Sequence, residues 1–514
     1  MAKLDNADPS PSAPVSLSQM AEYCRERAES KGRSEPGHPC AALETRGGSA
    51  ENAGRSVTAE AAIQGSSVND KMLSRAFAEE YGGIIRYVPE QGAFYCYDGE
   101  KWMLEKQEAR PSMMMKQFTD ELFAKSSGIP DEGKQADFRK SLAKYSGYNQ
   151  RSNALNDAKS ELVQRLDSFD AREMAVNVAN GTLDLETFKL YPHSPDDMLT
   201  RICKAGYDEC ADCAEWEAFL SETFGGDSEK IGYLQKVAGL AVAGDTSYER
   251  MHIAYGKPRS GKSTFLETIA EALGSYAATA NPETLAQAKR NAAGASGDLA
   301  RLAGVRFVVM PEAQKGMLLN VALLKRLTGG DMITARYLYR EEFQYRPRFS
   351  LWINTNSKPA ITDMTAFTGD RICIVSFNRS LDRCERDLGL KTRLKSQRNL
   401  DAVLLWAVRG LDRARKEGAE IPSSCRDDTE EYAEESDKIG GFFETCLEKS
   451  EGSAVDGGEA YSLYREYCES NGMLLEGKKS FFGELRERGL LVGQKRLDNV
   501  PRHNVVVGYR KRYT

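Results

Sequence analysis

One segment constrains the fold of this chain more than any other: Gly256-Lys257-Pro258-Arg259-Ser260-Gly261-Lys262-Ser263-Thr264. It matches the pattern G-x-x-x-x-G-K-[ST] in full, and an apolar run at 251–255 predicts a buried strand directly before it. A helical pattern begins at Lys262. Glycines let the backbone N–H groups of such a loop turn toward phosphate oxygens, and the helix N-terminus adds positive potential. The segment therefore predicts an α/β core with a nucleotide-phosphate site at the end of one strand.

Two side chains of this loop have the chemistry that a nucleoside triphosphate requires. Lys262 is expected to reach the β and γ phosphates, and the hydroxyl of Ser263 is expected to ligate Mg²⁺. We predict that ATP and Mg²⁺ are the cofactors and that residues 256–264 form the ATP site. The alternative is a chance match in a glycine-containing loop, which leaves the flanking strand and helix patterns unexplained.

An acidic residue follows the next apolar strand of the core. The strand at 306–310 ends in Pro311 and Glu312. A P-loop enzyme needs a carboxylate at the tip of a neighbouring strand to hold Mg²⁺ or to polarise the attacking water. Many such enzymes have two successive acidic residues here, whereas this chain has proline first. Glu312 is therefore predicted to act mainly as the catalytic base, with a further place in the Mg²⁺ site; the alternative is an ordinary surface glutamate.

A polar segment, 354–359, follows the strand at 349–353. An amide at the tip of such a strand can sense the γ phosphate and orient water. Asn356 is predicted to have this role, with Asn354 as the alternative. Asparagine and proline are common after strands. The prediction therefore depends on the position of this segment after the loop and Glu312.

Arg371 opens the following strand, directly after Asp370. In ring-forming ATPases, an arginine near this point reaches the nucleotide of the neighbouring subunit and stabilises charge on the γ phosphate. Arg371 is predicted to be this catalytic arginine finger. The alternative is a structural ion pair with Asp370 or with a residue at the sheet edge.

An element that contacts nucleic acid is predicted between Glu312 and Asn356. Segments 334–339 and 343–349 have the pattern of a hairpin with its tip near 339–342. Tyr339 could stack on a base and Arg340 could pair with phosphate, so both are predicted to contact DNA. The alternative is a surface hairpin of mixed charge, which the two glutamates at the tip favour.

The last part of the chain, 425–514, predicts helices followed by a β-hairpin, which is typical of a winged helix. The helices are expected at 439–449, 458–471 and 478–488, and the strands at 490–495 and 504–509. Basic residues gather in the third helix and the hairpin. Those predicted to contact DNA are Lys478, Lys479, Lys495 and Arg496. The alternative is a solvated basic face on a domain that packs subunits together.

The domain organisation follows from changes of pattern along the chain. Residues 1–70 are rich in small and polar residues and predict disorder. Residues 71–213 predict an α+β module with a helix, a small meander and an Asn180-Gly181 hairpin turn. Residues 214–424 alternate strands and helices, which predicts an AAA+-like P-loop ATPase core with a mostly parallel sheet, and 425–514 form the winged-helix-like domain.

Composition excludes some classes of protein. Apolar residues make up 41% and charged residues 28% of 514 residues, which is ordinary for a globular protein. No apolar run approaches the roughly 20 residues that span a bilayer, and the N-terminus lacks the apolar core of a secretory signal. A cytoplasmic protein without a membrane partner is expected, in the host cell if a phage encodes it.

Cys210 and Cys213 lack the further ligands that a zinc site needs. The net charge of -6 argues against a surface that coats nucleic acid, but not against a basic channel or terminal domain.

The ordered motifs resemble superfamily 3 helicases, in particular the branch of phage, plasmid and large DNA virus primase-helicases. The resemblance spans roughly 170–510, and its segments are 177–185, 191–195, 223–227, 256–264, 327–331, 354–359 and 371–377. It implies a hexameric ring that hydrolyses ATP at subunit interfaces, moves along single-stranded DNA and separates forked duplexes. It also implies the roles above for Lys262, Ser263, Glu312, Asn356 and Arg371. Asp370 departs from the pattern, because many relatives have a second arginine there.

The sequence therefore predicts the replicative helicase of a phage- or plasmid-like mobile element. The upstream region shows no acidic triad and no zinc-ribbon cysteines, so a separate primase or polymerase is an expected partner. The first alternative is an origin-binding initiator ring that uses ATP without processive unwinding. A small-molecule kinase ranks last, because it needs neither a sensor asparagine nor an intersubunit arginine.

Overall fold

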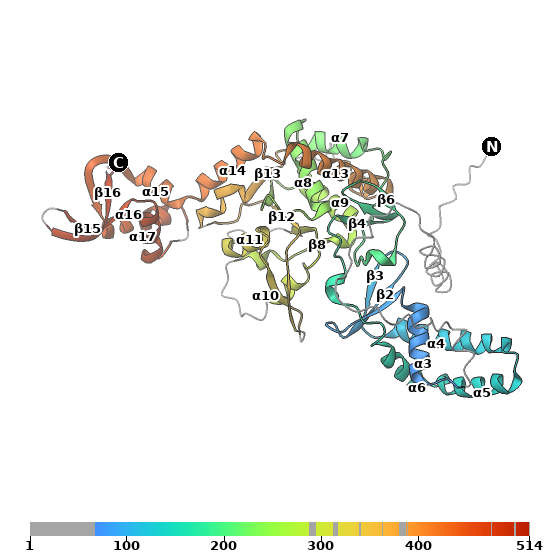
Figure 1. Ribbon diagram of the computed structural model, residues 1–514. Coiled ribbons are helices and arrows are strands. Elements are labelled where there is room, and N and C mark those ends of the chain that lie inside the picture. Colours follow the sequence, from blue (N-terminus) through green and yellow to red (C-terminus); the bar gives the residue numbers. More distant parts are fainter. Residues whose placement is uncertain are drawn as a thin grey trace, which may run out of the picture. The chain divides into compact units, whose positions relative to one another are not determined.

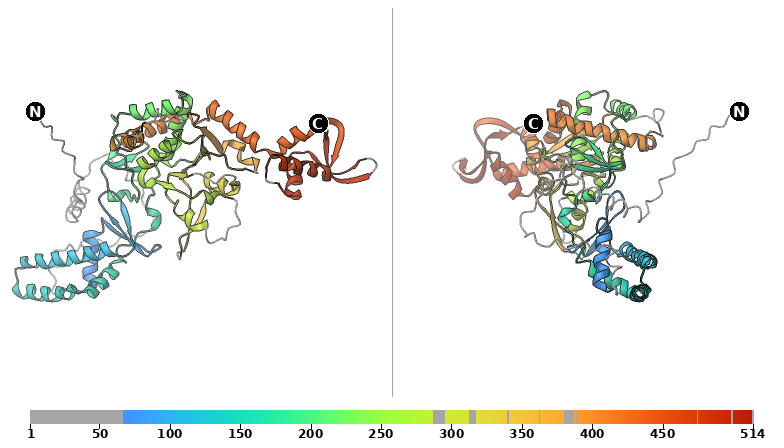
Figure 2. Two further views of the ribbon diagram at one scale, coloured as in Figure 1. Left: turned by 180° about the vertical axis from the view of Figure 1, so that it is seen from behind. Right: turned by 45° about the vertical axis from the view of Figure 1, so that its right-hand side comes forward.

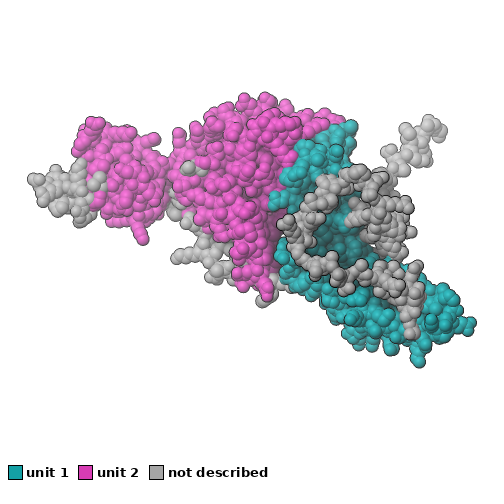
Figure 3. Space-filling model, in the orientation of Figure 1, with its two compact units in different colours: residues 1–211, 271–276, 396–405 teal, residues 212–270, 277–395, 406–514 magenta. Residues whose placement is uncertain are grey.

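The computed structural model describes residues 67–286, 295–311, 317–338, 341–361, 363–379, 387, 389–473, 475–497 and 500–512 (Figure 1). The segment predicted to be disordered is 1–70, and its residues 1–66 lie outside these ranges. The chain divides into two units (Figure 3). Unit 1 comprises 1–211, 271–276 and 396–405, and unit 2 comprises 212–270, 277–395 and 406–514.

Unit 1 begins with a helix and an antiparallel meander, as the sequence predicts. The strands are β1 (Ile85–Val88), β2 (Ala93–Tyr97) and β3 (Trp102–Glu105), in the order β1-β2-β3. The helices around them are α3 (Asp70–Tyr81), α4 (Ala109–Lys125), α5 (Glu132–Leu142) and α6 (Tyr148–Ala158). Asn69 caps α3, because its side chain accepts a hydrogen bond from the backbone N–H of Met72.

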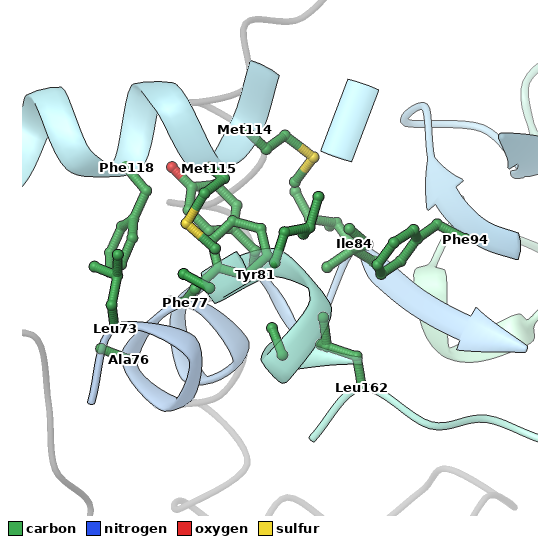
Figure 4. Packing of buried hydrophobic residues seen from close by; sticks show 14 of the residues in the cluster. Leu73, Ala76, Phe77, Tyr81, Ile84, Phe94, Met114, Met115, Phe118 and Leu162 are labelled. Carbon is green, nitrogen blue, oxygen red and sulfur yellow. The ribbon is translucent and has the colours of Figure 1, made fainter. Parts of the chain in front are cut away.

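Aromatic and methionine side chains form the core of unit 1 (Figure 4). Phe77 and Tyr81 lie one turn apart on α3, and their rings contact Phe118 of α4 with centroid separations of 5.8 and 5.9 Å. Met115 is fully buried beside them. Burial of each such side chain contributes about 1.5–3 kcal/mol. These contacts hold α3 against α4.

A second small sheet in unit 1 contains the predicted hairpin with a different turn. Its strands are β4 (Ala175–Val178), β5 (Gly181–Asp184) and β6 (Leu190–Tyr191). Val178 pairs with Gly181, so the turn is Ala179-Asn180 and the prediction of Asn180-Gly181 is wrong by one residue. A Cβ atom on Gly181 would lie 2.3 Å from the carbonyl oxygen of Tyr191. The close approach of β6 therefore explains this glycine.

Unit 2 contains a five-stranded sheet in which every pairing is parallel. Its strands are β7 (Met251–Tyr255), β8 (Ala277–Thr279), β9 (Phe307–Met310), β12 (Ser350–Thr355) and β13 (Ile372–Ser376). The spatial order is β13-β7-β12-β9-β8, so β12 lies between β7 and β9. Parallel strands end at the same edge of a sheet, and loops at this carboxyl edge form ligand sites in α/β folds. The predicted mostly parallel sheet is confirmed.

Helices cover this sheet, and α7, α8 and α13 lie together (Figures 1 and 2). The helices of this region are α7 (Ala214–Thr223), α8 (Ser228–Ala243), α9 (Lys262–Leu273), α10 (Ala295–Ala300), α11 (Val321–Thr328), α12 (Leu390–Leu394), α13 (Gln397–Glu417) and α14 (Ser423–Ser436). Trp216 of α7 contacts Trp406 of α13 with ring centroids 5.7 Å apart. Gln235 of α8 donates a hydrogen bond to the carbonyl oxygen of Trp406.

The hairpin predicted between the core strands is confirmed. Strands β10 (Ile333–Arg336) and β11 (Glu342–Tyr345) pair antiparallel, with Arg336 opposite Glu342. Tyr337 and Tyr345 donate hydrogen bonds to carbonyl oxygens of α10 and so hold the hairpin on that helix. The proposed tip residues Tyr339 and Arg340 lie outside the described residues.

The C-terminal part contains three helices and a three-stranded antiparallel sheet within the described ranges. Its elements are α15 (Lys438–Cys446), β14 (Leu447–Asp456), α16 (Gly457–Ser470), α17 (Lys478–Glu487), β15 (Leu491–Leu497) and β16 (Val500–Lys511). The strand order is β14-β16-β15. The sequence predicted the helices and the β15–β16 hairpin but missed β14. That strand is interrupted by an irregularity between Lys449 and Ala454 and contains few apolar residues.

None of the helices in the described part of the chain is both long and apolar enough to cross a lipid bilayer.

Glycines allow α8 and α13 to approach closely. A Cβ atom on Gly239 of α8 would lie 2.1 Å from the backbone nitrogen of Leu411. One on Gly410 of α13 would lie 2.0 Å from the carbonyl oxygen of Gln235. Both obstacles are backbone atoms, so a side chain at either position would push the helices apart.

We predict that Gly239→Ala lowers the free energy of unfolding of unit 2 by about 1–3 kcal/mol through this overpacking. Gly232→Ala in the same helix is the control, because its Cβ would meet only the guanidinium group of Arg413 at 3.4 Å. The control should gain up to about 1 kcal/mol from helix propensity. Urea unfolding followed by circular dichroism measures both effects, and equal midpoints for the two variants would contradict the close-packing argument.

Candidate nucleotide-binding site

The glycine-rich loop joins β7 to α9 at the carboxyl edge of the parallel sheet. A Cβ atom on Gly256 would lie 2.4 Å from the carbonyl oxygen of Phe377, which follows β13. Gly261 has a φ of +94°, and a Cβ atom there would lie 3.1 Å from Thr223 at the end of α7. A Cβ atom at Gly256 would therefore collide with the backbone, whereas at Gly261 the positive φ together with the close Thr223 side chain favours glycine. Arg259 has a left-handed φ of +69°, which is strained for a residue with a side chain.

Lys262 lies at the base of this loop and is only 5% exposed. Its Nζ donates hydrogen bonds to the carbonyl oxygens of Gly256 and Lys257, at 2.7 and 2.8 Å, and to Oγ of Ser260 at 3.2 Å. A buried ammonium group needs such partners, because loss of hydration is costly. The loop therefore wraps around one fixed positive charge.

The loop and the end of β12 enclose a pocket of about 280 Å³. The residues that line it are Pro258, Arg259, Ser260, Gly261, Lys262, Ser263, Thr264, Asn354, Thr355 and Asn356. This set includes seven of the predicted ATP-site positions, together with both candidate sensor asparagines. It contains two cationic side chains and no acidic one within the described part of the chain. A polyanion such as a triphosphate matches this charge.

The two asparagines occupy different places at this edge. Nδ2 of Asn354 donates a hydrogen bond to Oγ of Ser263 at 3.0 Å. Asn356 is exposed and follows the strand. Thr355 between them is buried, and its hydroxyl bonds to the backbone of Ser357, which closes the turn. Sequence reasoning chose Asn356 and offered Asn354 only as an alternative sensor. It missed the contact with Ser263, because a contact between segments 91 residues apart is not visible in a local motif.

Ser263 has the chemistry of a Mg²⁺ ligand, because Mg²⁺ binds oxygen ligands and a hydroxyl at this point of a P-loop can supply one. Glu312 lies outside the described residues, so its roles as base and Mg²⁺ ligand stay predictions. The described neighbour Pro311 follows β9 directly. Among the described residues, no group of three or more histidine, cysteine or acidic side chains could hold a metal ion.

Arg371 lies at the opposite edge of the sheet from the pocket. It precedes β13, and the next residue, Ile372, pairs with Met251 at the start of β7. The loop begins after Tyr255, at the other end of β7. At a rise of about 3.3 Å per residue, roughly 16 Å of strand separates Arg371 from the loop of its own chain.

A reciprocal set of ion pairs holds Arg371. Its guanidinium contacts the carboxylate of Glu249 at 2.6 Å. Arg250, which follows Glu249, contacts Asp370, which precedes Arg371, at 3.5 Å. Glu249 and Asp370 both have left-handed φ values, of +52° and +58°. The ion-pair partner of Arg371 is thus Glu249 and not Asp370. Nη1 of Arg371 is buried without a hydrogen-bond partner among the described residues.

Two of the four basic residues predicted to contact DNA in the C-terminal part have described side chains. Lys478 and Lys479 are exposed at the first turn of α17, and the Lys478 ammonium lies 5.4 Å from the ring centre of Tyr461. Arg488 instead pairs with Asp437 through two hydrogen bonds, of 2.8 and 2.7 Å. This pairing lowers the pKa of Asp437 against the opposing effect of burial. The side chains of Lys495 and Arg496 lie outside the described residues.

His252, the second residue of β7, was not singled out by the sequence. Its ring stacks on Trp352 of β12 with centroids 4.6 Å apart, and its Nε2 lies 2.9 Å from the hydroxyl of Tyr233. Burial, together with the nearby Arg250, lowers its pKa from 6.5 to about 3. A neutral histidine thus joins α8 to the two central strands.

Three family models match successive parts of this chain. They are described as D5 N terminal like (residues 74–225), a family of unknown function, DUF5906 (254–371), and poxvirus D5 protein-like (434–489). Two apo structures of the NrS-1 C-terminal region share the fold, with TM-scores of 0.50 and 0.51 at 10% identity. Each covers 86% of this chain, which in turn covers 99% and 100% of theirs.

Two curated relatives are named as helicases. The putative helicase 022R of Frog virus 3 (isolate Goorha) is 25% identical over 315 residues, which cover 58% of this chain and 31% of the relative. The putative helicase L207/L206 of Acanthamoeba polyphaga mimivirus is 26% identical over 216 residues, covering 41% and 22%. The chain thus spans less than a third of the length of these relatives. Fold and site define an α/β protein with a cationic pocket of about 280 Å³ at the carboxyl edge of a parallel sheet. The matches to the two D5-like models and to the putative viral helicases support a phage and viral primase-helicase family.

The lowered pKa of His252 predicts a specific dependence of stability on pH. Between about pH 3 and 6.5 the unfolded chain binds a proton at this position and the native chain does not. The free energy of unfolding should therefore fall below pH 6.5, by up to about 1.4 kcal/mol per pH unit from this group. His252→Asn removes the titration and keeps a polar partner for Tyr233. If the variant showed the same pH slope as the parent protein in urea unfolding, His252 would not be the source.

Proposed function

We propose that this chain is an ATP-dependent DNA helicase of a phage-, plasmid- or virus-like replication system, with the superfamily 3 arrangement of an AAA+-like P-loop core. The observation that supports this most directly is the pocket in which Lys262, Ser263 and the end of β12 meet. In this proposal the loop 256–264 binds the triphosphate of ATP. When ATP binds, the Lys262 ammonium group exchanges its hydrogen bonds to the loop carbonyls for hydrogen bonds to the β and γ phosphates.

Hydrolysis in this proposal takes place between adjacent copies. Ser263 holds Mg²⁺, which neutralises charge on the β and γ phosphates. Glu312 accepts a proton from the attacking water, and Asn356 orients that water at the mouth of the pocket. Arg371 is about 16 Å of strand away from its own loop, so it acts on the nucleotide of a neighbouring subunit in a ring, for which six copies are the expectation.

DNA contacts in this proposal come from two elements. The β10–β11 hairpin presents Tyr339 and Arg340 to the single strand in the ring channel. The C-terminal part has the helix and strand order of a winged helix, and Lys478 and Lys479 begin its third helix. Together with Lys495 and Arg496 they contact phosphates of forked DNA. A separate primase or polymerase supplies primer synthesis.

Lys262→Ala is expected to reduce ATP hydrolysis at least about 100-fold and to abolish strand displacement, because it removes the charge that binds the phosphates. ATPase assays with and without single-stranded DNA, and unwinding of a forked duplex, measure these losses. Lys416→Ala is the control, since this lysine on α13 is 70% exposed and pairs with Asp412 one turn earlier in the same helix. Wild-type protein that forms rings with ATP but unwinds nothing would support the initiator alternative instead.

Mixing variants tests whether Arg371 acts on the neighbouring subunit. Arg371→Ala and Lys262→Ala should each be inactive alone. In mixed rings, about a quarter of the interfaces would join an intact loop to an intact arginine, and ATPase activity should partly return. Loss of Arg371 leaves no buried charge behind, because the Glu249 side chain is 42% exposed.

The control mixture combines Lys262→Ala with a variant that has both changes, since no interface in it has an intact loop. Activity that stays absent in both mixtures would contradict action between subunits.

A further inference from the structure

The hydrogen bond between Asn354 and Ser263 connects two segments that the motif assigns to separate tasks. Ser263 lies in the first turn of α9, and Asn354 lies inside β12, where it pairs with Ala254 of β7. Nδ2 of Asn354 donates to Oγ of Ser263 at 3.0 Å. The sheet fixes the Asn354 backbone, because the pairing with β7 runs through Asn354 and the pairing with β9 reaches the preceding residue, Ile353. The amide is therefore presented to the hydroxyl by a rigid element.

Asn354 and Asn356 have different positions relative to the loop. Asn354 is half-buried and contacts the helix that follows the loop, whereas Asn356 is exposed beyond the end of β12. Their tasks in the pocket therefore differ, although the sequence offers both for the same role.

Among the described residues, the position of the β9 segment that comes level with Asn354 has no polar side chain. Met310 of β9 pairs with Ile353, so the next residue, Pro311, comes level with Asn354. Proline has no polar side-chain atom. The partner that contacts the Ser263 hydroxyl thus comes from β12, which lies between β7 and β9.

We propose that Asn354 is a positioning residue that orients the Ser263 hydroxyl for a divalent cation. This inference rests on the proposed function. A serine hydroxyl has two lone pairs and one proton. The Asn354 N–H group occupies one lone pair, which leaves the second lone pair for the cation and the proton for a phosphate oxygen. Without this bond, the serine side chain is free to rotate among its three staggered positions.

Loss of this hydrogen bond is expected to change the affinity for Mg²⁺ more than the rate of the chemical step. Loss of one neutral hydrogen bond corresponds to a change of about three- to tenfold in affinity. Asn354→Ala should raise the Mg²⁺ concentration for half-maximal ATPase activity by this factor. It should leave kcat at saturating Mg²⁺ within about twofold, because the ligand itself is retained. Asn356→Ala is the matched variant, and it should lower kcat at every Mg²⁺ concentration without this shift.

The experiment titrates Mg²⁺ at fixed ATP for the full chain and for Asn354→Ala, Asn354→Asp, Asn356→Ala, Ser263→Ala and the double variant at 263 and 354. Aspartate has nearly the same shape as asparagine. Asn354→Asp should therefore restore a low Mg²⁺ concentration for half-maximal activity, because a carboxylate accepts the Ser263 proton and attracts the cation. It also keeps the test informative if the alanine variant does not fold. In the Ser263→Ala background, Asn354→Ala should have no further effect.

An unchanged Mg²⁺ half-saturation in Asn354→Ala, or additive effects in the double variant, would overturn the role of Asn354 while leaving the proposed function intact. Failure of the wild-type chain to bind nucleotide in a Mg²⁺-dependent way, measured with a fluorescent ATP analogue, would instead overturn both proposals. The two failures are therefore distinguishable.

Discussion

Parallel pairing of β13, β7 and β12 determines where the chemistry of this chain can occur. Because the three strands run in one direction, residues that follow β7 and β12 meet at one edge, and residues that precede β13 lie at the other. Ile253, Ile353 and Ile374 on these strands are fully buried. Both faces of β7 and β13 are buried, so a slip of one residue would exchange the side chains packed on one face for those packed on the other. The contact between Ser263 and Asn354 depends on that register.

Local motifs predicted much of this arrangement correctly. The strand at 251–255, the loop after it and the hairpin around 334–349 follow from residue order alone, because glycine conformation, helix N-termini and alternating apolar residues act over short distances. The candidate pocket also gathers residues 258–264 with both asparagines at 354 and 356. The resemblance to viral helicases agrees with the D5-like family model and the putative viral helicase found by comparison.

The features that the sequence could not predict are contacts between distant segments. The Asn354 amide reaches Ser263 because β12 is inserted between β7 and β9, an order that is not the order of the chain. Glu249 pairs with Arg371 because the segments that precede the neighbouring strands β7 and β13 lie side by side. Strand β14 was missed because its burial depends on pairing with β16, since its own residues are mostly charged or small.

The pairing of Arg371 with Glu249 has a consequence for communication around a ring. Under the proposed function, a neighbour can draw Arg371 away only by presenting more negative charge than one partly exposed carboxylate. A bound triphosphate meets that condition better than a diphosphate, which lacks the terminal phosphoryl group. Competition from Glu249 would then keep Arg371 away from a diphosphate, so that hydrolysis is restricted to interfaces whose neighbouring site holds ATP.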